Sequence, residues 1–358
     1  MMEIKKLRIF EMFAGYGGAS FALRKAGIEY ECVGFSEIYE PGIKTFKLNH
    51  GDVKNYGDCT QIVPEQLPDF DLLTGGFPCQ PFSVNTRETA RGEVHKSYNL
   101  FMDIIRILKY KRPRYILLEN VKGIMGEKAK EVRETLIAQL RELGYDLRFK
   151  ILNTKDHGLP QNRERVFFVG KLGHWTGNPF KDPEFEFPLE EELKLSVRDL
   201  LEDGVERREP QIKNYELNKQ CNLERYGNIT RFEAILQTPV KKKGSNVAFE
   251  ILDAPSNVVS RQCDRIYHPT FAPCLTATGK DYLFYVDGKV IVLTPRECFR
   301  LMGFLDDEIK LPEDTSESQQ HHLAGNGWDI NLVSKIFKRM FKDKQNINID
   351  KRVVPLNV

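Results

Sequence analysis

The sequence predicts an α/β protein, doubly wound around a mostly parallel sheet, with a second, smaller domain. Three observations lead to this prediction: the first half alternates apolar runs with segments of helical periodicity, glycine pairs follow two of those runs, and residues 177 to about 289 are polar and irregular. Parallel strands must be joined by crossover connections, which are usually helices. The alternation therefore favours a parallel sheet with helices on both faces.

The predicted elements follow one another in strand–helix order. Each predicted strand is a short apolar run, typical of a strand buried on both faces, and these runs cover residues 8–13, 30–35, 71–74, 115–118 and 165–169. The predicted helices have apolar residues three or four positions apart and cover residues 19–26, 41–49, 100–109, 131–143, 294–302 and 331–341. Gly17-Gly18 and Gly75-Gly76 provide turns after the strands at 8–13 and 71–74, and Pro295 suits the first turn of a helix. We expect three units: 1–190 around the sheet, 191–297 as the second domain, and 298–358 as a hinge and a C-terminal helix that returns to the first unit.

The composition excludes several classes of protein. No run reaches the roughly 18 apolar residues of a membrane span, and the charged start lacks a secretion signal, so we expect a cytoplasmic protein without membrane association. The seven cysteines are scattered and odd in number, which argues against a disulfide framework or a zinc ribbon. The pair His321-His322 lacks metal-ligand spacing, so we expect no bound metal and a surface position for this pair. The formal net charge of +2 leaves only local basic patches, such as Lys241-Lys242-Lys243 or Arg207-Arg208, as candidates for nucleic-acid contacts, and such runs are most often solvated surface.

A cofactor site is expected where the first strand meets the first helix. The turn from Phe13 to Gly18 holds three glycines, which allow the backbone to approach a ligand closely. Glu37 follows about 20 residues later at the end of the second strand, where a carboxylate accepts from a ribose hydroxyl. Asp58 is expected at the end of a further strand, where it would accept from an adenine amino group. The pattern indicates an adenosine-containing cofactor; the glycine spacing is not that of nicotinamide enzymes, and no P-loop lysine follows.

Cys79 is the candidate nucleophile. It lies between Pro78 and Pro81 in a turn directly after the strand at 71–74, and ligands of open α/β sheets bind at that edge. An isolated cysteine is usually a small buried hydrophobic residue, but this position presents the thiol.

These segments resemble the motifs of the cytosine-5 DNA methyltransferase family, particularly its compact restriction-modification type. The matching motifs occur in the family order and span nearly the whole chain except about 180–290; they are Phe-x-Gly-x-Gly-Gly at 13–18, Gly-Phe-Pro-Cys-Gln-Pro-Phe-Ser at 76–83, Glu119-Asn120-Val121, Gln161-Asn162-Arg163-Glu164-Arg165, Pro295-Arg296-Glu297 with Met302-Gly303-Phe304, and Gly325-Asn326. The resemblance implies an S-adenosylmethionine-dependent methyltransferase fold, a smaller DNA target-recognition domain at 191–297, and S-adenosylhomocysteine as product, without a metal.

The resemblance also implies roles for individual residues. The implied catalytic residues are Cys79, which adds to carbon 6 of cytosine, Glu119, which protonates N3, Arg165, which donates to O2, and Arg163, which braces the site. The implied cofactor residues are Phe13, Ala14, Gly15, Gly17, Gly18, Glu37, Ile38, Asp58, Cys59, Pro78, Leu100 and Asn326. The implied DNA-binding residues are Gln80, Ser83, Arg91, Lys96, Thr276, Thr278, Gly279 and Arg296, with Thr276 to Gly279 similar to the family's short target-recognition signature. Because a paired base hides carbon 6, the target must be flipped out of double-stranded DNA.

Two positions depart from the family pattern. Ser97-Tyr98-Asn99 stands where the family often has Arg-Gly before Leu-Phe, which leaves Lys96 or Arg91 to contact phosphate. Gly327 stands where the family usually has serine, so a hydroxyl near the cofactor is lost.

Several alternatives stay open at this point. They are an RNA (transfer RNA) cytosine-5 methyltransferase, an inactive DNA-binding relative, and a nicotinamide oxidoreductase. The long variable segment before Thr276 favours DNA, and the retention of Cys79, Glu119 and Arg165 favours an active enzyme. We expect a monomer encoded by a bacterium or phage; the DNA target and the existence of a separate restriction endonuclease are not readable from the sequence.

Overall fold

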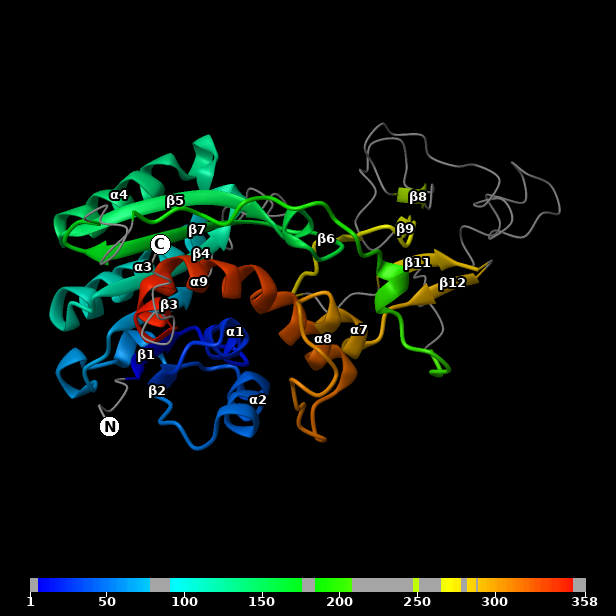
Figure 1. The fold of residues 1–358 in the computed structure, drawn as a ribbon, viewed down its shortest axis with the longest axis horizontal. Helices are drawn as coiled ribbons and strands as arrows, with labels where there is room; N and C mark the ends of the chain where they lie inside the picture. Colours follow the sequence, from blue (N-terminus) through cyan, green and yellow to red (C-terminus); the bar gives the residue numbers. More distant parts are fainter. Residues whose placement is uncertain are drawn as a thin grey trace, which may run out of the picture.

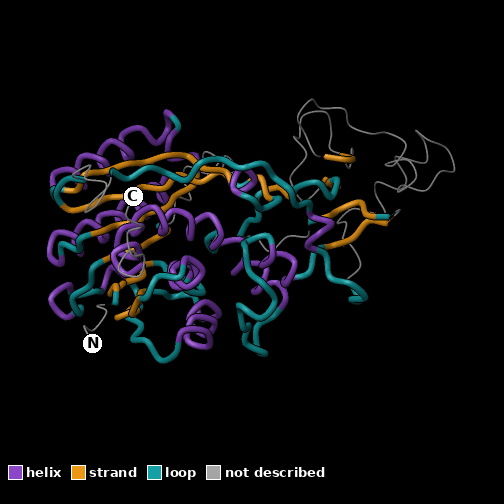
Figure 2. Tube along the Cα trace, in the orientation of Figure 1, coloured by secondary structure: helices purple, strands orange, loops and turns teal. Residues whose placement is uncertain are grey.

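The fold is described here from a computed structural model of the chain. The structure describes residues 6–77, 91–175, 184–207, 247–250, 265–277, 282–287 and 289–349. A large sheet covered by helices occupies one end of the long axis, and a smaller sheet occupies the other end (Figures 1 and 2). None of the helices in these ranges combines the length and the apolar character that crossing a bilayer requires.

The central sheet has six strands in the order β2-β1-β3-β4-β7-β5. Its strands are β1 (Leu7–Met12), β2 (Tyr30–Ser36), β3 (Leu72–Gly76), β4 (Tyr115–Val121), β5 (Tyr145–Asn153) and β7 (Glu164–Leu172). The pairs β1–β2, β1–β3 and β3–β4 are parallel, whereas β7 runs antiparallel to β4 and β5. The predicted mostly parallel sheet is therefore confirmed. The chain adds β2 on one side of β1 and then adds β3 on the other side, so the strand order reverses between β1 and β3. Ligands of such sheets bind at this switch point.

Helices cover both faces of this sheet. Successive strand residues alternate between two apolar cores: Ile9, Leu72 and Leu117 lie in one, and Phe10, Leu73 and Leu118 lie in the other. The first core is closed by α1 (Gly18–Ala26) and α9 (Ile330–Ile349), and the second by α3 (Arg91–Lys111) and α4 (Lys130–Glu142). At the β2 edge, α2 (Glu40–His50) stacks the ring of Phe46 on Phe35 at a centroid distance of 3.9 Å.

The remaining elements surround the small sheet. That sheet has the order β12-β11-β9-β8, from β8 (Val247–Glu250), β9 (Arg265–Tyr267), β11 (Leu283–Val286) and β12 (Lys289–Val292). A two-residue parallel pair, β6 (Gln161–Asn162) with β10 (Ala272–Pro273), joins the end of the central sheet to this region. The chain then returns through α7 (Pro295–Arg300) and α8 (Glu317–Asn326). Short 3-10 helices cover Cys59–Gln61, Pro64–Gln66, Lys122–Met125, Glu127–Ala129, Thr154–His157 and Val197–Leu200.

Two predictions about elements were wrong, and further elements were not predicted. The strand expected to end at Asp58 is absent from this described stretch; Asp58 instead caps a 3-10 helix by accepting from the amide of Thr60. The edge strand β5 and the polar helix α8 were not predicted. In addition, Thr294 is the N-terminal cap of α7 and not part of the helix, because its hydroxyl accepts from the amide of Glu297.

Candidate active site

A solvent-open cleft lies at the carboxyl ends of β1 and β3. Its walls come from both ends of the chain: Glu11, Met12, Phe13, Ala14, Gly15, Gly18, Ala19, Thr74, Gly75, Gly76, Asn326, Gly327 and Trp328. Five predicted cofactor residues are among them: Phe13, Ala14, Gly15, Gly18 and Asn326. Trp328 was not predicted, although it lies two residues after Asn326 in the sequence.

The turn that floors this cleft has an unusual backbone. Phe13, Gly15 and Gly17 have φ angles of 52°, 54° and 87°, a region that L side chains seldom adopt. At Gly17 a Cβ would lie 2.3 Å from His50 Nε2, whereas at Gly15 it would meet nothing within 4 Å. Gly17 is therefore needed for packing, and Gly15 presents open backbone to the cleft.

Two buried or half-buried carboxylates fix this turn. Glu11 accepts from the amides of Ala19 and Ser20 at 3.2 and 3.1 Å, and burial raises its pKa to about 7 against the opposing effect of these hydrogen bonds. Glu37 accepts from the amides of Gly15, Ile38 and Tyr39 at 2.7, 2.9 and 2.8 Å. The carboxylate of Glu37 is thus held against the turn at a defined position.

The other predicted cofactor residues in the described part of the chain are not among the walls of the cleft: Gly17, Glu37, Ile38, Asp58, Cys59 and Leu100. Ile38 is 71% exposed, and Cys59 is buried in the core shared with α3. Leu100 packs against that same core. Pro78 lies outside the described residues.

Glu119 and Arg165 form an ion pair beside the cleft. Glu119 lies near the end of β4, opposite Gly76 of β3, and Arg165 of β7 lies opposite Val121. The distance between Arg165 Nε and Glu119 Oε1 is 2.9 Å, and both side chains are at most 15% exposed. The α-carbon of Gly76 faces Glu119 Oε2 and Trp328 Nε1, since a Cβ there would lie 3.0 and 2.9 Å from these atoms. The strand ends thus bring the predicted acid and its arginine to the wall of the cleft.

Asn120 anchors the segment that leads to the predicted nucleophile. Its fully buried side chain donates to the carbonyl of Phe77 at 3.3 Å. Cys79, Gln80 and Ser83 lie outside the described residues. The anchored carbonyl is two residues before Cys79, so β4 fixes the start of the nucleophile segment as well as Glu119.

Arg163 ties the cleft to the chain around Cys274. Its buried guanidinium donates to the carbonyls of Leu275, Gly325 and Gly327 at 2.9, 3.1 and 2.8 Å. The Sγ of Cys274 lies 3.6 Å from Arg163 Nη1 and 3.5 Å from Arg165 Nη2. Burial alone would raise the pKa of the Cys274 thiol, but the guanidiniums of Arg165 and Arg163 outweigh it and lower that pKa. Sequence reasoning missed Cys274, and its only signal was its place two residues before Thr276.

The predicted DNA contacts are scattered. Arg91 and Lys96 lie in the first part of α3, where the structure describes the backbone alone. Thr276 contacts the hydroxyl of Tyr282 through Oγ1 at 3.1 Å, and Arg296 donates to the carbonyl of Asp306. Thr278 and Gly279 lie outside the described residues.

Two surface predictions were wrong. His321 is only 4% exposed and its Nε2 lies 3.2 Å from the carbonyl of Leu293. Arg207 is not solvated surface, because it pairs with the buried carboxylate of Glu297 at 2.6 Å. Lys241-Lys242-Lys243 and Arg208 lie outside the described residues.

Comparison with known proteins gives consistent results. A family model described as C-5 cytosine-specific DNA methylase matches residues 7–342. The chain is 32% identical over 347 residues to the type II methyltransferase M.HhaI of Haemophilus parahaemolyticus, covering 94% of this chain and 96% of that protein. It is 30% identical over 338 residues to the type II methyltransferase M.NlaX of Neisseria lactamica, covering 93% and 96%.

Solved structures resemble the fold. The S. pombe Dnmt2 methyltransferase superposes with a TM-score of 0.65 at 23% identity, covering 94% of this chain and 99% of that one. The methyltransferase EhMeth of Entamoeba histolytica gives a TM-score of 0.65 at 17% identity, covering 95% and 99%. At these identities the likeness concerns the fold alone.

Proposed function

The chain belongs to the family of C-5 cytosine-specific DNA methylases and is a DNA cytosine-5-methyltransferase, and from this premise we propose that Cys79, Glu119 and Arg165 carry its chemistry. The observation that supports the proposal best is the 2.9 Å ion pair between Glu119 and Arg165. Its carboxylate faces the α-carbon of Gly76, three residues before Cys79. A nucleophile, an acid and a guanidinium therefore originate from adjacent strand ends.

The reaction needs a nucleophile because carbon 5 of cytosine is itself a weak one. The Cys79 thiolate adds to carbon 6, and the electrons of the 5,6 double bond move into the ring toward N3. Glu119 donates a proton to N3, which leaves an enamine whose carbon 5 is nucleophilic. After methyl transfer, a water molecule takes the carbon 5 proton, the bond between carbon 6 and sulfur breaks to release the Cys79 thiolate, and N3 returns its proton to Glu119, so that the aromatic ring is restored.

Arg165 and Arg163 have different parts in this proposal. Arg165 holds Glu119 through Nε, and we propose that it donates a further N–H to O2 of the base, where negative charge develops. Arg163 has its donors committed to the carbonyls of Leu275, Gly325 and Gly327. It therefore positions the cleft wall rather than the base.

The cleft fits an adenosine-containing methyl donor, which we propose to be S-adenosylmethionine. Gly15 offers open backbone, and three amides hold the Glu37 carboxylate close to it, in an orientation suited to a ribose hydroxyl. Phe13, Ala14, Gly18 and Asn326 would line the bound molecule. When bound, this donor supplies a methyl group on a positively charged sulfur.

Double-stranded DNA is the proposed substrate, with the target cytosine flipped toward Glu119. Flipping costs a few kcal/mol, and we propose that the region 191–297 contacts the DNA and compensates this cost. A single copy of the chain contains every residue that the proposed chemistry needs, which supports a monomeric enzyme.

Bisulfite sequencing tests the proposal. Plasmid would be isolated from a methylation-free host that expresses the wild-type chain, Cys79→Ala or Glu119→Gln. We expect methylcytosine at one short motif with the wild type, none with Cys79→Ala, and a strongly reduced level with Glu119→Gln. Full methylation by Cys79→Ala would refute the assignment of the nucleophile.

A further inference from the structure

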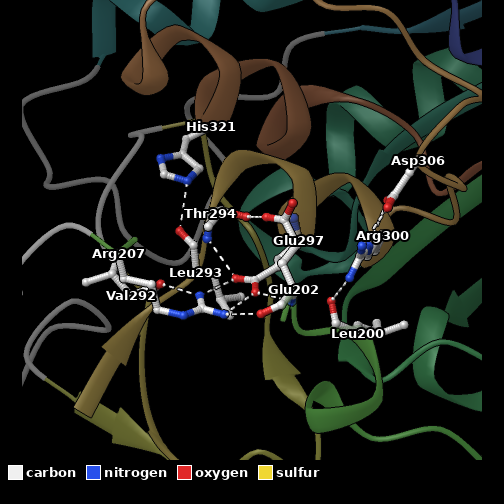
Figure 3. Close-up of polar contacts among 10 residues, drawn as sticks. All are labelled: Leu200, Glu202, Arg207, Val292, Leu293, Thr294, Glu297, Arg300, Asp306 and His321. Carbon is white, nitrogen blue, oxygen red and sulfur yellow. Dashed lines mark hydrogen bonds and ion pairs between the residues drawn. The ribbon is translucent and has the colours of Figure 1, made fainter. Parts of the chain in front are cut away.

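A buried ion pair between Arg207 and Glu297 holds together two passages of the chain (Figure 3). The first passage is the segment 200–207, which leads into the variable stretch beginning at residue 208. The second passage runs from β12 through Leu293 and Thr294 into α7 and leads back to the catalytic unit. The polypeptide reaches the C-terminal helices from that stretch through the second passage.

Glu297 is the acceptor at the centre of this contact. It is 1% exposed, and each of its two carboxylate oxygens accepts two hydrogen bonds. Oε1 accepts from Arg207 Nη2 at 2.6 Å and from the amide of Glu202 at 2.8 Å. Oε2 accepts from Arg207 Nη1 and from the amide of Thr294, both at 2.8 Å. The carboxylate thus binds both passages at once.

Arg207 reinforces the same junction with its remaining donors. Nη1 also donates to the carbonyl of Val292 at 3.1 Å, and Nη2 donates to the carbonyl of Glu202 at 3.3 Å. Only the planar fork of arginine reaches a carboxylate and two carbonyls in this way. A lysine would keep the charge and lose this geometry.

The junction continues toward the cofactor cleft. Arg300 of α7 donates to the carbonyl of Leu200 at 2.9 Å, and His321 of α8 contacts the carbonyl of Leu293 at 3.2 Å (Figure 3). The helix α8 ends at Asn326, which lines the cleft. The orientation of the two passages is therefore set relative to the active site.

We infer that Arg207 and Glu297 are positioning residues for the DNA substrate. By fixing both passages, they set the orientation of the region that recognises DNA relative to Glu119 and the cleft. This inference rests on the proposed function, because it takes the region 191–297 to be the part that contacts DNA. A loosened junction would leave only a fraction of the molecules with that region in the productive orientation, and the apparent affinity for DNA falls by the same fraction.

The test compares Arg207→Lys with Arg198→Lys as a matched control. Arg198 lies just before this segment, in the 3-10 helix Val197–Leu200. It pairs with Asp287 at 2.8 Å, but that pair is exposed, with side-chain exposures of 51% and 74%. Steady-state methylation of duplex DNA and equilibrium binding of S-adenosylmethionine would be measured for both. We expect Arg207→Lys to raise KM for DNA about 10- to 100-fold, as when only about 1–10% of the molecules are competent to bind, with kcat at saturating DNA and cofactor affinity unchanged, and Arg198→Lys to match the wild type.

A second variant separates positioning from folding. Leaving the Glu297 carboxylate buried without a partner would destabilise the chain, so Arg207→Met is combined with Glu297→Met. We expect this double variant to fold, to bind cofactor normally and to show the same rise in KM for DNA. A wild-type KM in folded Arg207→Lys and in the double variant would overturn the inference. If kcat and cofactor binding instead fell in proportion to the fraction of unfolded protein, Arg207 and Glu297 would have only a structural role.

The same assays separate this inference from the proposed function. If the wild type methylates DNA and Cys79→Ala does not, the proposed function stands whatever the Arg207 variants do. If the wild type methylates no DNA, the proposed function fails and the inference falls with it.

Discussion

At the scale of single residues, Cys274 is the least expected member of the candidate site. Two guanidiniums converge on its sulfur, at 3.6 Å from Arg163 and 3.5 Å from Arg165. Arg165 also holds Glu119, so the sulfur helps to orient the arginine that holds the proposed acid. The geometry makes Cys274 a positioning residue for Arg165.

Replacing Cys274 should therefore slow the reaction in a graded way. Hydrogen bonds to charged groups contribute about 1.5–3 kcal/mol, so Cys274→Ala should lower the single-turnover rate about tenfold. Cys274→Ser keeps an acceptor and should stay within about threefold of the wild type. The check is rapid-quench methyl transfer with saturating DNA and cofactor; equal rates for the alanine and serine variants would remove the role of the acceptor.

His50 makes stability depend on pH. Its ring lies between Phe21 and Phe46, with centroid distances of 4.6 and 4.7 Å, Nε2 lies 3.0 Å from the carbonyl of Tyr16, and Nδ1 lies 3.3 Å from Arg24 Nη2. Because a carbonyl only accepts, the neutral ring must carry its proton on Nε2 and accept at Nδ1. Burial lowers the pKa of His50 to about 4, so the folded state resists protonation.

The direction of the pH effect follows from this shift. The unfolded chain binds the proton near pH 6.5 and the folded chain near pH 4, so stability is complete above pH 6.5 and is lost as pH falls toward 4. The loss should reach roughly 2 kcal/mol at pH 5. His50→Gln keeps both hydrogen bonds without titrating, and urea denaturation at pH 7, 6 and 5 should show a shallower decline for it. Parallel declines in the two proteins would exclude His50 as the source.

At the scale of elements, the contact between α8 and the first turn explains a departure from the family pattern. Gly327 ends α8 with a φ of −75°, which any residue adopts. Space is the constraint, because a Cβ at Gly327 would lie 2.1 Å from Tyr16 Cε1. Tyr16 is fully buried, and its hydroxyl donates to the carbonyl of Trp328 at 2.8 Å. A tyrosine at 16 thus requires a glycine at 327.

This contact predicts that substitutions at Tyr16 and Gly327 have non-additive effects on the free energy of unfolding. Gly327→Ser should destabilise the wild type by about 1–3 kcal/mol through overpacking, and much less in a Tyr16→Ala background, where the space is open. Urea denaturation of the four proteins in the cycle gives the coupling energy, expected to be at least about 1 kcal/mol. Additive effects would mean that Tyr16 moves aside freely.

The elements that could be predicted are those buried on both sides. The strands β1, β3 and β4 each contain adjacent apolar residues, Ile9-Phe10, Leu72-Leu73 and Ile116-Leu117-Leu118, because helices cover both of their faces. The edge strand β5 escaped prediction because charged residues such as Asp146, Arg148 and Lys150 interrupt its apolar positions. The helix α8 has no apolar stripe; its ends are defined by a capping box between Ser316 and Gln319 and by tertiary packing, which overrides weak local preference.

The residues of the candidate site also differ in whether a local sequence pattern predicts them. Glu119 and Arg165 could be predicted because motif order, together with strand ends, placed both at one edge of the sheet. Cys274, Trp328 and the Arg207–Glu297 pair could not, because they reach their partners from distant parts of the chain. No local sequence pattern indicates that Arg207 binds a carboxylate 90 residues away in the chain.

At the scale of the whole molecule, the two ends of the chain build one layer. The helix α9 packs against α1 on the same face of the sheet, and Phe341 contacts the ring of Tyr115 at a centroid distance of 5.1 Å. The cleft repeats this pattern, because Phe13 to Gly18 and Asn326 to Trp328 form facing walls. Folding of the sheet and formation of the cofactor cleft therefore depend on the same long-range contact.

A substitution in α9 far from the cleft should thus affect both. Phe337 is completely buried, whereas Lys338 beside it is exposed. Phe337→Ala should lower the free energy of unfolding by about 3–5 kcal/mol, and Lys338→Ala should change it by less than about 0.5 kcal/mol. Because α9 begins two residues after Trp328, looser packing of α9 should also weaken S-adenosylmethionine binding in Phe337→Ala, at temperatures where the protein is still folded. Urea denaturation and calorimetric titration measure the two quantities. A destabilised Phe337→Ala protein with wild-type cofactor affinity would show that the cleft walls keep their geometry without the full packing of the terminal helix, and that the two dependences are separate.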